Sequence, residues 1–296
     1  MKKIVIALLL LSQVSLFAQD YKFGKVSKEE LEEKFYPLDS TADAAYLYRS
    51  RRTYFDYTSS NGFQMVTDIH ERIKIYTKEG FDMANKSVTY YDPEHGEEQS
   101  VSSIKGYTYS LVNGKVEKEK LSKKGIFKEK KNRSFSIKKI TMPNINEGVV
   151  IEIKYKLISP YTSSINDLEF QYGIPVKKLS YQVEIPEYYV FNKRSKGYYF
   201  VKMISESKSG RIGDTDFRIN VYKFNSKNIP ALKNDEPFIS SIYNYRGGMS
   251  FELTQRNFLS IGGGIDTFSN TWEDVSKPIF KSSSFCSELN KSSYYK

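Results

Sequence analysis

Apolar and polar positions alternate regularly between residues 149 and 157, in the segment VVIEIKYKL. Val149, Ile151, Ile153 and Tyr155 form the apolar set, and most positions between them are charged. This period of two is typical of a β-strand that buries one face. Turn residues lead into the segment, and a Ser-Pro pair closes it, because proline cannot donate to a strand ladder. We therefore predict a core strand here.

Similar short runs recur from about residue 44 to residue 224, separated by turn residues such as Gly, Pro, Asn and Ser. The predicted strands cover residues 52–57, 63–69, 106–112, 115–118, 134–140, 149–157, 179–185, 188–190, 198–204 and 217–224. Asn113-Gly114 joins two of these runs and supplies the positive φ angles of a type I′ hairpin turn. Many short strands at near-regular spacing favour a mainly β fold, either an antiparallel β-sandwich or an open barrel.

A short helix is predicted before the first strand. Ser27 and Glu30 have the spacing of a capping box, in which each side chain accepts a hydrogen bond from the other residue's amide. Apolar residues on either side of the box occupy the positions of a hydrophobic staple. The predicted helix covers residues 28–35 and ends before Pro37.

The pattern changes after Pro230, where glycine-rich stretches predict loops and an amphipathic segment begins at Trp272. We predict four parts: a signal peptide at 1–18, an N-terminal arm with a short helix and the first strand at 19–57, a β-sandwich domain at 58–230, and a linker with the start of a truncated second module at 231–296. The last part is expected to be an incomplete helical and loop segment.

The net charge and the N-terminal segment predict a class of partner and a cellular compartment. The 296 residues carry a formal net charge of +10, which suits nucleic acid, an anionic membrane surface or an acidic polysaccharide. A basic start, the apolar run from Ile4 to Leu11 and Ala18 form a secretory signal that is too short to remain as a membrane span. Export to the periplasm or the extracellular or outer-membrane surface makes nucleic acid an unsuitable partner and leaves an envelope peptide or acidic glycan.

Candidate catalytic residues are few. The single cysteine, Cys286, excludes an internal disulfide and a multi-thiolate zinc site. A nucleophilic cysteine needs a histidine and an orienting acid, and the two histidines, His70 and His95, lie far upstream. We therefore interpret Cys286 as a structural thiol and predict no catalytic, cofactor-binding or metal-binding residue.

Two loops have the composition of ligand sites. Residues 92–98, DPEHGEE, contain five potential metal ligands, although their spacing matches no defined motif and a solvated acidic turn is the favoured interpretation. Gly262–Gly264 lacks the strand, helix and lysine of a phosphate loop, which favours a flexible linker.

A lysine-rich stretch extends from Lys115 to Lys139. It contains Lys118, Lys120, Lys123, Lys124, Lys128, Lys130, Lys131, Arg133 and Lys138. One interpretation is a patch for acidic glycans or lipid head groups. The other, which we favour, is the solvated face of an edge hairpin, where lysines oppose aggregation.

The runs TMPNINEGVVIEIKYKLISPY and FQYGIPVKKLSYQVEIPE resemble domain-of-unknown-function family 3857. SKEELEEKFYPLDSTADAAYLY resembles the usual beginning of that domain, and NIPALKNDEPFISSIYNYRGGMSFEL with TWEDVSKPIF resembles its usual end. In exported Bacteroidota proteins this domain typically precedes a transglutaminase-like module with a Cys-His-Asp triad, so the resemblance implies that this chain stops before that module. Residues 285–289 fall where relatives tend to have a Phe-Gly segment, and no histidine follows Cys286, so no functional residue is carried over.

These observations favour a non-catalytic, exported β-sandwich module, accessory to a transglutaminase-like domain, that binds or positions a peptide or glycan at the cell envelope. The alternative is a cysteine-dependent transglutaminase-like or protease-like enzyme whose catalytic part is missing from this chain. A structural or adhesion subunit would share the fold and differ in its partners.

Overall fold

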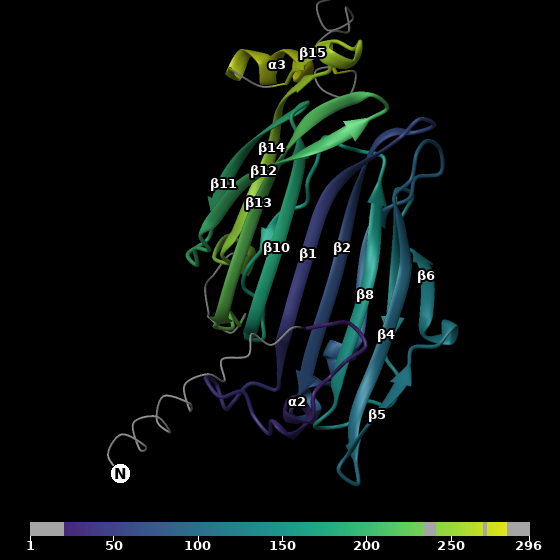
Figure 1. Cartoon of the computed structure of the whole chain (residues 1–296), viewed down its shortest axis with the longest axis vertical. Coiled ribbons are helices and arrows are strands. Elements are labelled where there is room, and N and C mark those ends of the chain that lie inside the picture. The colour runs from purple at the N-terminus through teal and green to yellow at the C-terminus, as the bar shows by residue number, and fades with distance from the viewer. Residues whose placement is uncertain (1–20, 234–240, 269–270, 283–296) are drawn as a thin grey trace, which may run out of the picture.

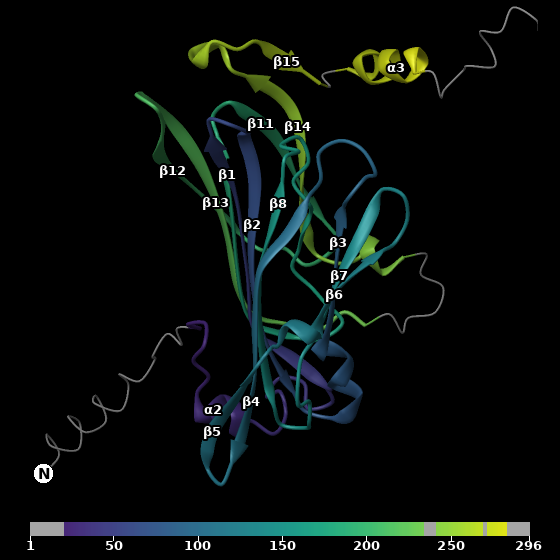
Figure 2. The same ribbon diagram turned by 90° about the vertical axis from the view of Figure 1, so that its right-hand side faces the viewer.

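The fold comes from a computed structural model, which describes residues 21–233, 241–268 and 271–282. These residues are mainly in β-strands, arranged as one large sheet with two smaller sheets against one of its faces (Figures 1 and 2). The described part of the chain forms no closed barrel, and the prediction of a mainly β, antiparallel fold is confirmed. The predicted signal peptide, 1–18, lies outside the described residues.

The large sheet has eight described strands in the order β12-β13-β10-β1-β2-β8-β4-β5. Their bounds are Ala44–Thr58 for β1, Gly62–Ile75 for β2, Ser100–Val112 for β4, Lys115–Lys120 for β5, Val150–Ser159 for β8, Val176–Pro186 for β10, Met203–Ile212 for β12 and Thr215–Ile229 for β13. Neighbours pair antiparallel except β1 and β10, which are parallel and place Tyr46 opposite Val176.

The smaller sheets and the helices complete the described fold. One sheet has the order β3-β7-β6, and in the other β11-β14-β15 follow one another while β9 also pairs with β14. The strands are β3 Asn85–Tyr91, β6 Ile126–Lys130, β7 Phe135–Thr141, β9 Leu168–Glu169, β11 Tyr189–Lys196, β14 Gly248–Asn257 and β15 Ile265–Thr267. The α-helices are α2 Lys28–Glu32 and α3 Trp272–Lys281, and the 3-10 helices are η1 Lys78–Ala84, η2 Lys123–Gly125, η3 Ile242–Asn244 and η4 Leu259–Ile261. Of the described helices, none has the length and apolar character needed to cross a membrane.

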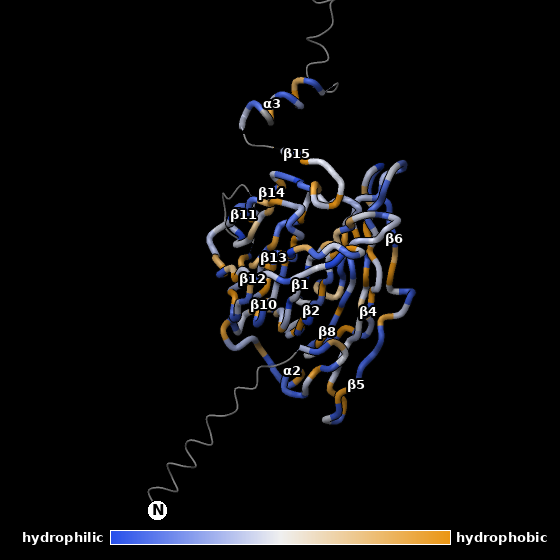
Figure 3. Tube along the Cα trace, turned by 45° about the horizontal axis from the view of Figure 1, so that its top comes forward, coloured by the Kyte–Doolittle hydropathy of each residue, from blue (hydrophilic) through white to orange (hydrophobic). Residues whose placement is uncertain are grey.

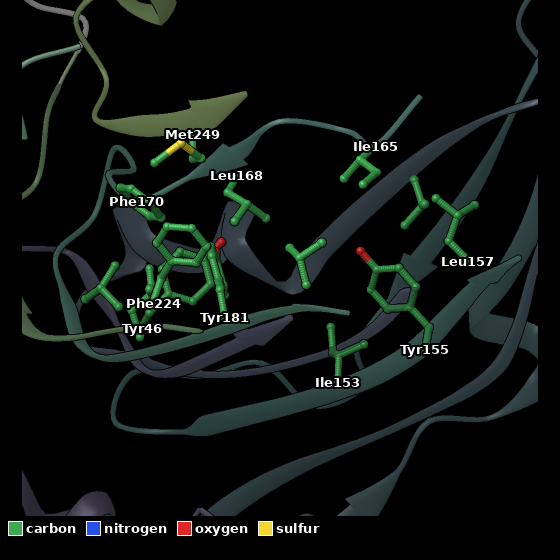
Figure 4. Close-up of a cluster of buried hydrophobic side chains, with 14 of the residues drawn as sticks. Tyr46, Ile153, Tyr155, Leu157, Ile165, Leu168, Phe170, Tyr181, Phe224 and Met249 are labelled. Carbon is green, nitrogen blue, oxygen red and sulfur yellow. The ribbon is translucent and has the colours of Figure 1, made fainter. Parts of the chain in front are cut away.

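The main core lies between the large sheet and the smaller sheets. Ile153 on β8 and Tyr181 on β10 enter it from the large sheet, and Met249 enters it from β14 (Figure 4). Hydrophobic and hydrophilic positions alternate along the strands (Figure 3), because successive side chains point to opposite faces. The alternation predicted from residue 149 therefore does place one set of side chains in the core.

A cluster of charged side chains is buried on this core face. Glu71 on β2 pairs with Arg49 on β1 and accepts a hydrogen bond of 2.8 Å from Lys86 on β3. Arg49 also donates to the hydroxyl of Tyr181 (2.8 Å), and its guanidinium lies 4.2 Å from the ring centre of Tyr172. Burial acts to raise the pKa of Glu71, but the charges of Arg49 and Lys86 outweigh it and lower the pKa to about 2.

The opposite face of the large sheet, called the outer face below, is covered at one end by the N-terminal arm. Figure 2 shows α2 on the other side of the large sheet from β3, β6 and β7. Tyr21 and Leu31 of the arm pack against Val150 on β8 and neighbouring side chains. The prediction that β8 buries a single face is therefore wrong at this end, where Val150 and Glu152 are buried as well.

Helix α2 has the predicted capping box. The Ser27 amide donates to the Glu30 carboxylate (2.8 Å), and the Glu30 amide donates to the Ser27 hydroxyl (3.3 Å). The helix ends at Glu32 rather than residue 35, because Glu33 is already extended. The side chain of Glu33 accepts a hydrogen bond from Tyr76 (2.6 Å), so a tertiary contact replaces the predicted last turn.

The hairpin predicted at Asn113-Gly114 is confirmed, and its strands are longer than predicted. Asn113 and Gly114 have φ angles of 50° and 75° between β4 and β5, as a type I′ turn requires. The strands predicted at 52–57 and 63–69 pair as parts of β1 and β2.

Three local predictions are wrong. The strand predicted at 198–204 is irregular until Met203, where β12 begins. The loops predicted after Pro230 include β14, whose apolar side chains enter the core. Gly262–Gly264 was predicted to be a flexible linker, but it belongs to the turn between β14 and β15. In this turn the Phe258 amide donates to the Gly264 carbonyl (2.9 Å).

Candidate anion-binding site

A pocket of about 440 Å³ opens on the outer face, beside the end covered by the arm. It lies over β1, β2, β8 and β4, in the interior of the large sheet. Most of its lining residues carry a polar group, and three are lysines: the residues are Ser50, Asp68, Ile69, His70, Ser103, Lys105, Lys154, Tyr155 and Lys156. We call this site the lysine pocket.

The register of the four strands explains how these side chains meet. Ser50 on β1 is opposite His70 on β2, His70 is opposite Lys154 on β8, and Lys154 is opposite Lys105 on β4. Residues directly opposite one another point to the same face, with Cβ atoms about 5 Å apart. Four residues that are distant in the sequence therefore form one row across four strands.

A β-bulge in β4 brings Lys105 into this row. The register between β4 and β8 shifts between Ser102, opposite Lys156, and Lys105, opposite Lys154. β4 therefore uses one residue more than β8 over this interval, and Ser103 adopts a left-handed φ of 53°. Without the extra residue, Ile104 would stand opposite Lys154, whereas it packs on the core. A left-handed residue other than glycine at the edge of a pocket is a feature often found at functional sites.

The charges in the pocket are only partly balanced. Lys156 forms an ion pair with Asp68 (3.0 Å), whereas no ion pair joins Lys105 or Lys154 to any acid in the described part of the chain. The ammonium of Lys154 lies 4.5 Å from the ring centre of Phe23. Like charges placed directly opposite destabilise a sheet. An anion between Lys105 and Lys154 would relieve this repulsion and be stabilised by both charges.

His70 is held by a buried carboxylate below the pocket. Its Nε2 lies 2.8 Å from Oε1 of Glu152, and its ring packs edge-on against Phe23 and Tyr48. Ser50, His70 and Glu152 thus have the residue types of a catalytic triad, but the structure forms no hydrogen bond between the described side chains of Ser50 and His70. A serine nucleophile needs that hydrogen bond for activation. Among the described residues, these three side chains therefore do not form a connected triad.

Glu152 also connects the pocket to the N-terminal arm. Its carboxylate accepts hydrogen bonds from the Gly24 amide (2.8 Å), the Tyr109 hydroxyl (3.0 Å) and the Arg72 guanidinium (2.6 Å). Arg72 in turn donates to both oxygens of Glu30 (3.0 and 3.1 Å). Burial acts to raise the pKa of Glu152, but the hydrogen bond from His70 and the charge of Arg72 outweigh it, so the pKa is lowered.

The candidate residues identified from the sequence are not brought together. Cys286 lies outside the described residues, His70 is in the lysine pocket, and His95 is exposed in the loop between β3 and β4. In the loop at 92–98, Asp92 accepts a hydrogen bond from Ser136 and pairs with Lys128 (2.9 Å). These contacts lower the pKa of Asp92. Within the described ranges, no three His, Cys, Asp or Glu side chains group as metal ligands.

The lysine-rich stretch at 115–139 covers two edge strands. β5 is the last strand of the large sheet, and β6 is the last strand of the sheet with β3 and β7. This placement is the one expected of lysines that protect exposed edges.

Sequence reasoning missed Lys105, Lys154 and Lys156 as site residues. The signal was present in β8, where lysines at 154 and 156 occupy the polar positions of the alternation. Their convergence with Lys105 depends on strand register and on the bulge at Ser103, which no local pattern in the sequence indicates.

Comparison with known proteins places the fold. Residues 63–233 match the family described as "Domain of Unknown Function with solved-structure structure (DUF3857)". The comparison with curated proteins found no match. A crystal structure of a "putative protease" from Parabacteroides distasonis is similar, with a TM-score of 0.57 and 16% sequence identity, over 72% of this chain and 41% of that protein. At this identity the similarity shows the fold alone, and this chain spans about two fifths of that protein's length.

A second solved structure, yeast LTA4 hydrolase in complex with Bestatin, aligns over 85% of this chain and 33% of that one. Its TM-score is 0.31 and its identity 11%, so the alignment carries no argument about fold or function.

Proposed function

Because the chain belongs to the DUF3857 family, we propose that it is a non-catalytic β module of the cell envelope that binds an acidic peptide or glycan in the lysine pocket. Its role is accessory to a transglutaminase-like domain, as the sequence resemblance implies. The predicted signal peptide supports export, and the excess of basic residues suits an anionic partner.

One observation carries the proposal. Lys105 and Lys154 stand directly opposite each other on the outer face, and neither has an acidic partner in the described part of the chain. Other lysines of the same sheet are neutralised, as Lys223 is by Glu206 and Lys208 by Glu184. The pocket is therefore a place where bound anions replace a missing protein charge.

The test is binding of two labelled probes, poly-L-glutamate and polygalacturonate, to the purified chain at low and moderate salt. We expect at least one probe to bind, more weakly as salt screens the lysines. Lys154→Gln should weaken binding several-fold, a loss of about 1 kcal/mol for a partly exposed ion pair.

The matched control is Lys223→Gln, which removes the same charge from the same sheet at an ion-paired position. We expect it to leave binding unchanged within about twofold, since bound anions do not need this lysine. The proposal fails if neither probe binds, or if the two variants weaken binding equally.

A further inference from the structure

The lysine pocket is one end of a longer row of lysines without acidic partners. Next to Lys105 on the outer face, Tyr107 of β4 stands opposite Lys120 of β5, and Tyr109 stands opposite Lys118. Cross-strand partners share a face, so Lys118 and Lys120 point to the same side as the pocket. The ammonium of Lys118 confirms this by lying 5.0 Å from the ring centre of Tyr107.

We call Lys154, Lys105, Lys120 and Lys118 the lysine strip. They follow one another across β8, β4 and β5. Strands are about 4.8 Å apart, so the strip extends about 10 Å across them. Lys118 is opposite Tyr109, four residues beyond Lys105, so the strip also extends about 13 Å along the strands. In the described ranges, none of the four lysines forms an ion pair with an acid. The glutamates of β5, Glu117 and Glu119, alternate with these lysines and point to the opposite face.

From this geometry we propose that the strip binds a linear acidic polysaccharide, with one carboxylate in the lysine pocket and others beside Lys120 and Lys118. The proposal rests on the proposed function and specifies its ligand. A single anion would use only the pair Lys105 and Lys154, whereas a polyanion would compensate the whole strip. Two aromatic rings, Phe23 and Tyr107, lie among the lysines with centres 5.7 Å apart, and they offer apolar surface to sugar rings.

An acidic peptide fits this surface less well. Peptides gain much of their affinity from main-chain hydrogen bonds to an unpaired strand edge. The strip crosses β8 and β4, which are paired on both sides, so a peptide lying along it would find no edge there. A peptide added to the free edge of β5 would reach Lys118 and Lys120 without entering the pocket.

The experiment compares three double variants of the purified chain, each of which removes two positive charges from the outer face. Lys105→Gln with Lys154→Gln alters the pocket, and Lys118→Gln with Lys120→Gln alters the far end of the strip. Lys208→Gln with Lys223→Gln is the control, because both lysines are ion-paired on the same sheet. The probes are galacturonate, a long oligogalacturonate, poly-L-glutamate, neutral dextran and phosphatidylglycerol vesicles.

We expect the long oligogalacturonate to bind more tightly than the monomer, and each strip variant to weaken it about tenfold. The control should change binding by less than about twofold. Neutral dextran should not bind, and poly-L-glutamate and the vesicles should bind more weakly than the oligogalacturonate.

The other outcomes separate this inference from the proposed function. If only the pocket variant weakens binding, the proposed function of the lysine pocket is retained and the proposed polysaccharide site along the strip is wrong. Preference for poly-L-glutamate or for vesicles overturns the polysaccharide and leaves an acidic peptide or a membrane surface. Equal loss in all three variants would mean that net charge alone attracts the probe, and binding of no probe would remove both proposals.

Discussion

Replacing Glu152 with glutamine should destabilise the chain and release its N-terminal arm. The Glu152 carboxylate is fully buried and joins strand β8 to β2 through His70 and Arg72, and to the arm through the Gly24 amide. Glutamine keeps the shape of the side chain and loses its charge. The buried guanidinium of Arg72 would then lose one of its two carboxylate partners and keep the other, Glu30.

The magnitude follows from the burial of both partners. Removing one partner of a buried ion pair costs about 3–5 kcal/mol, because the remaining charge stays out of water. Arg72 keeps Glu30, and a glutamine oxygen still accepts hydrogen bonds from Gly24 and Tyr109, so we expect the lower end, about 3 kcal/mol. For a chain of this size that loss corresponds to a fall in melting temperature of roughly 6–12 °C.

Two measurements check this prediction. Urea unfolding at pH 7 gives the change in unfolding free energy, and limited trypsin digestion reports cleavage after Lys22 and Lys25 in the arm. Both measurements should change in Glu152→Gln, and neither should change appreciably in Glu206→Gln, whose half-exposed ion pair is worth less than about 1 kcal/mol. The reasoning is refuted if Glu152→Gln unfolds within about 1 kcal/mol of the wild type and its arm is cleaved at the wild-type rate.

Three further outcomes are expected. The pKa of Glu71 is lowered to about 2 in the folded state, which contributes stability above the ordinary pKa of a glutamate. This stability is lost as the pH falls toward 2, so the urea midpoint should fall between pH 5 and pH 3. Glu71→Gln should make that fall smaller. Ser103→Gly should leave stability within about 1 kcal/mol of the wild type, whereas Ser103→Val should cost about 1–2 kcal/mol in urea unfolding, because a β-branched residue resists a left-handed φ. Gly247→Ala should lower the free energy of unfolding by about 1–3 kcal/mol, because the new Cβ would collide with the backbone carbonyl of Tyr199. Gly173 has open space around it, so Gly173→Ala should leave the melting temperature nearly unchanged.

Local patterns were sufficient for much of the β structure. The hairpin at Asn113-Gly114 and the capping box at Ser27 each depend on interactions within a few residues, and both are present as predicted. The strand around Ile151 was predicted from alternation alone, and its apolar set does lie in the core. For the hairpin turn and the capping box the whole interaction lies within a few residues, so no tertiary information is needed to predict them.

The errors occur where distant segments decide the structure. The pair Gly247-Gly248 has the composition of a loop, yet β14 begins at Gly248. Glycine is needed there because a Cβ would meet the carbonyl of Leu168 on β9. The burial of Val150 and Glu152 depends on an arm that lies more than 100 residues earlier in the chain. A single-sequence pattern has no means of assigning either contact.

The candidate site was hidden for the same physical reason. Lys105 lies ten residues before Lys115, the first lysine of the basic stretch. Lys154 occupies an ordinary polar position of a strand. Only the antiparallel pairing of β4 with β8 and one extra residue at Ser103 put these two lysines opposite each other. A sheet that places like charges in one row loses stability at that row, and this cost is the reason that we propose a bound anion as the partner of the two lysines.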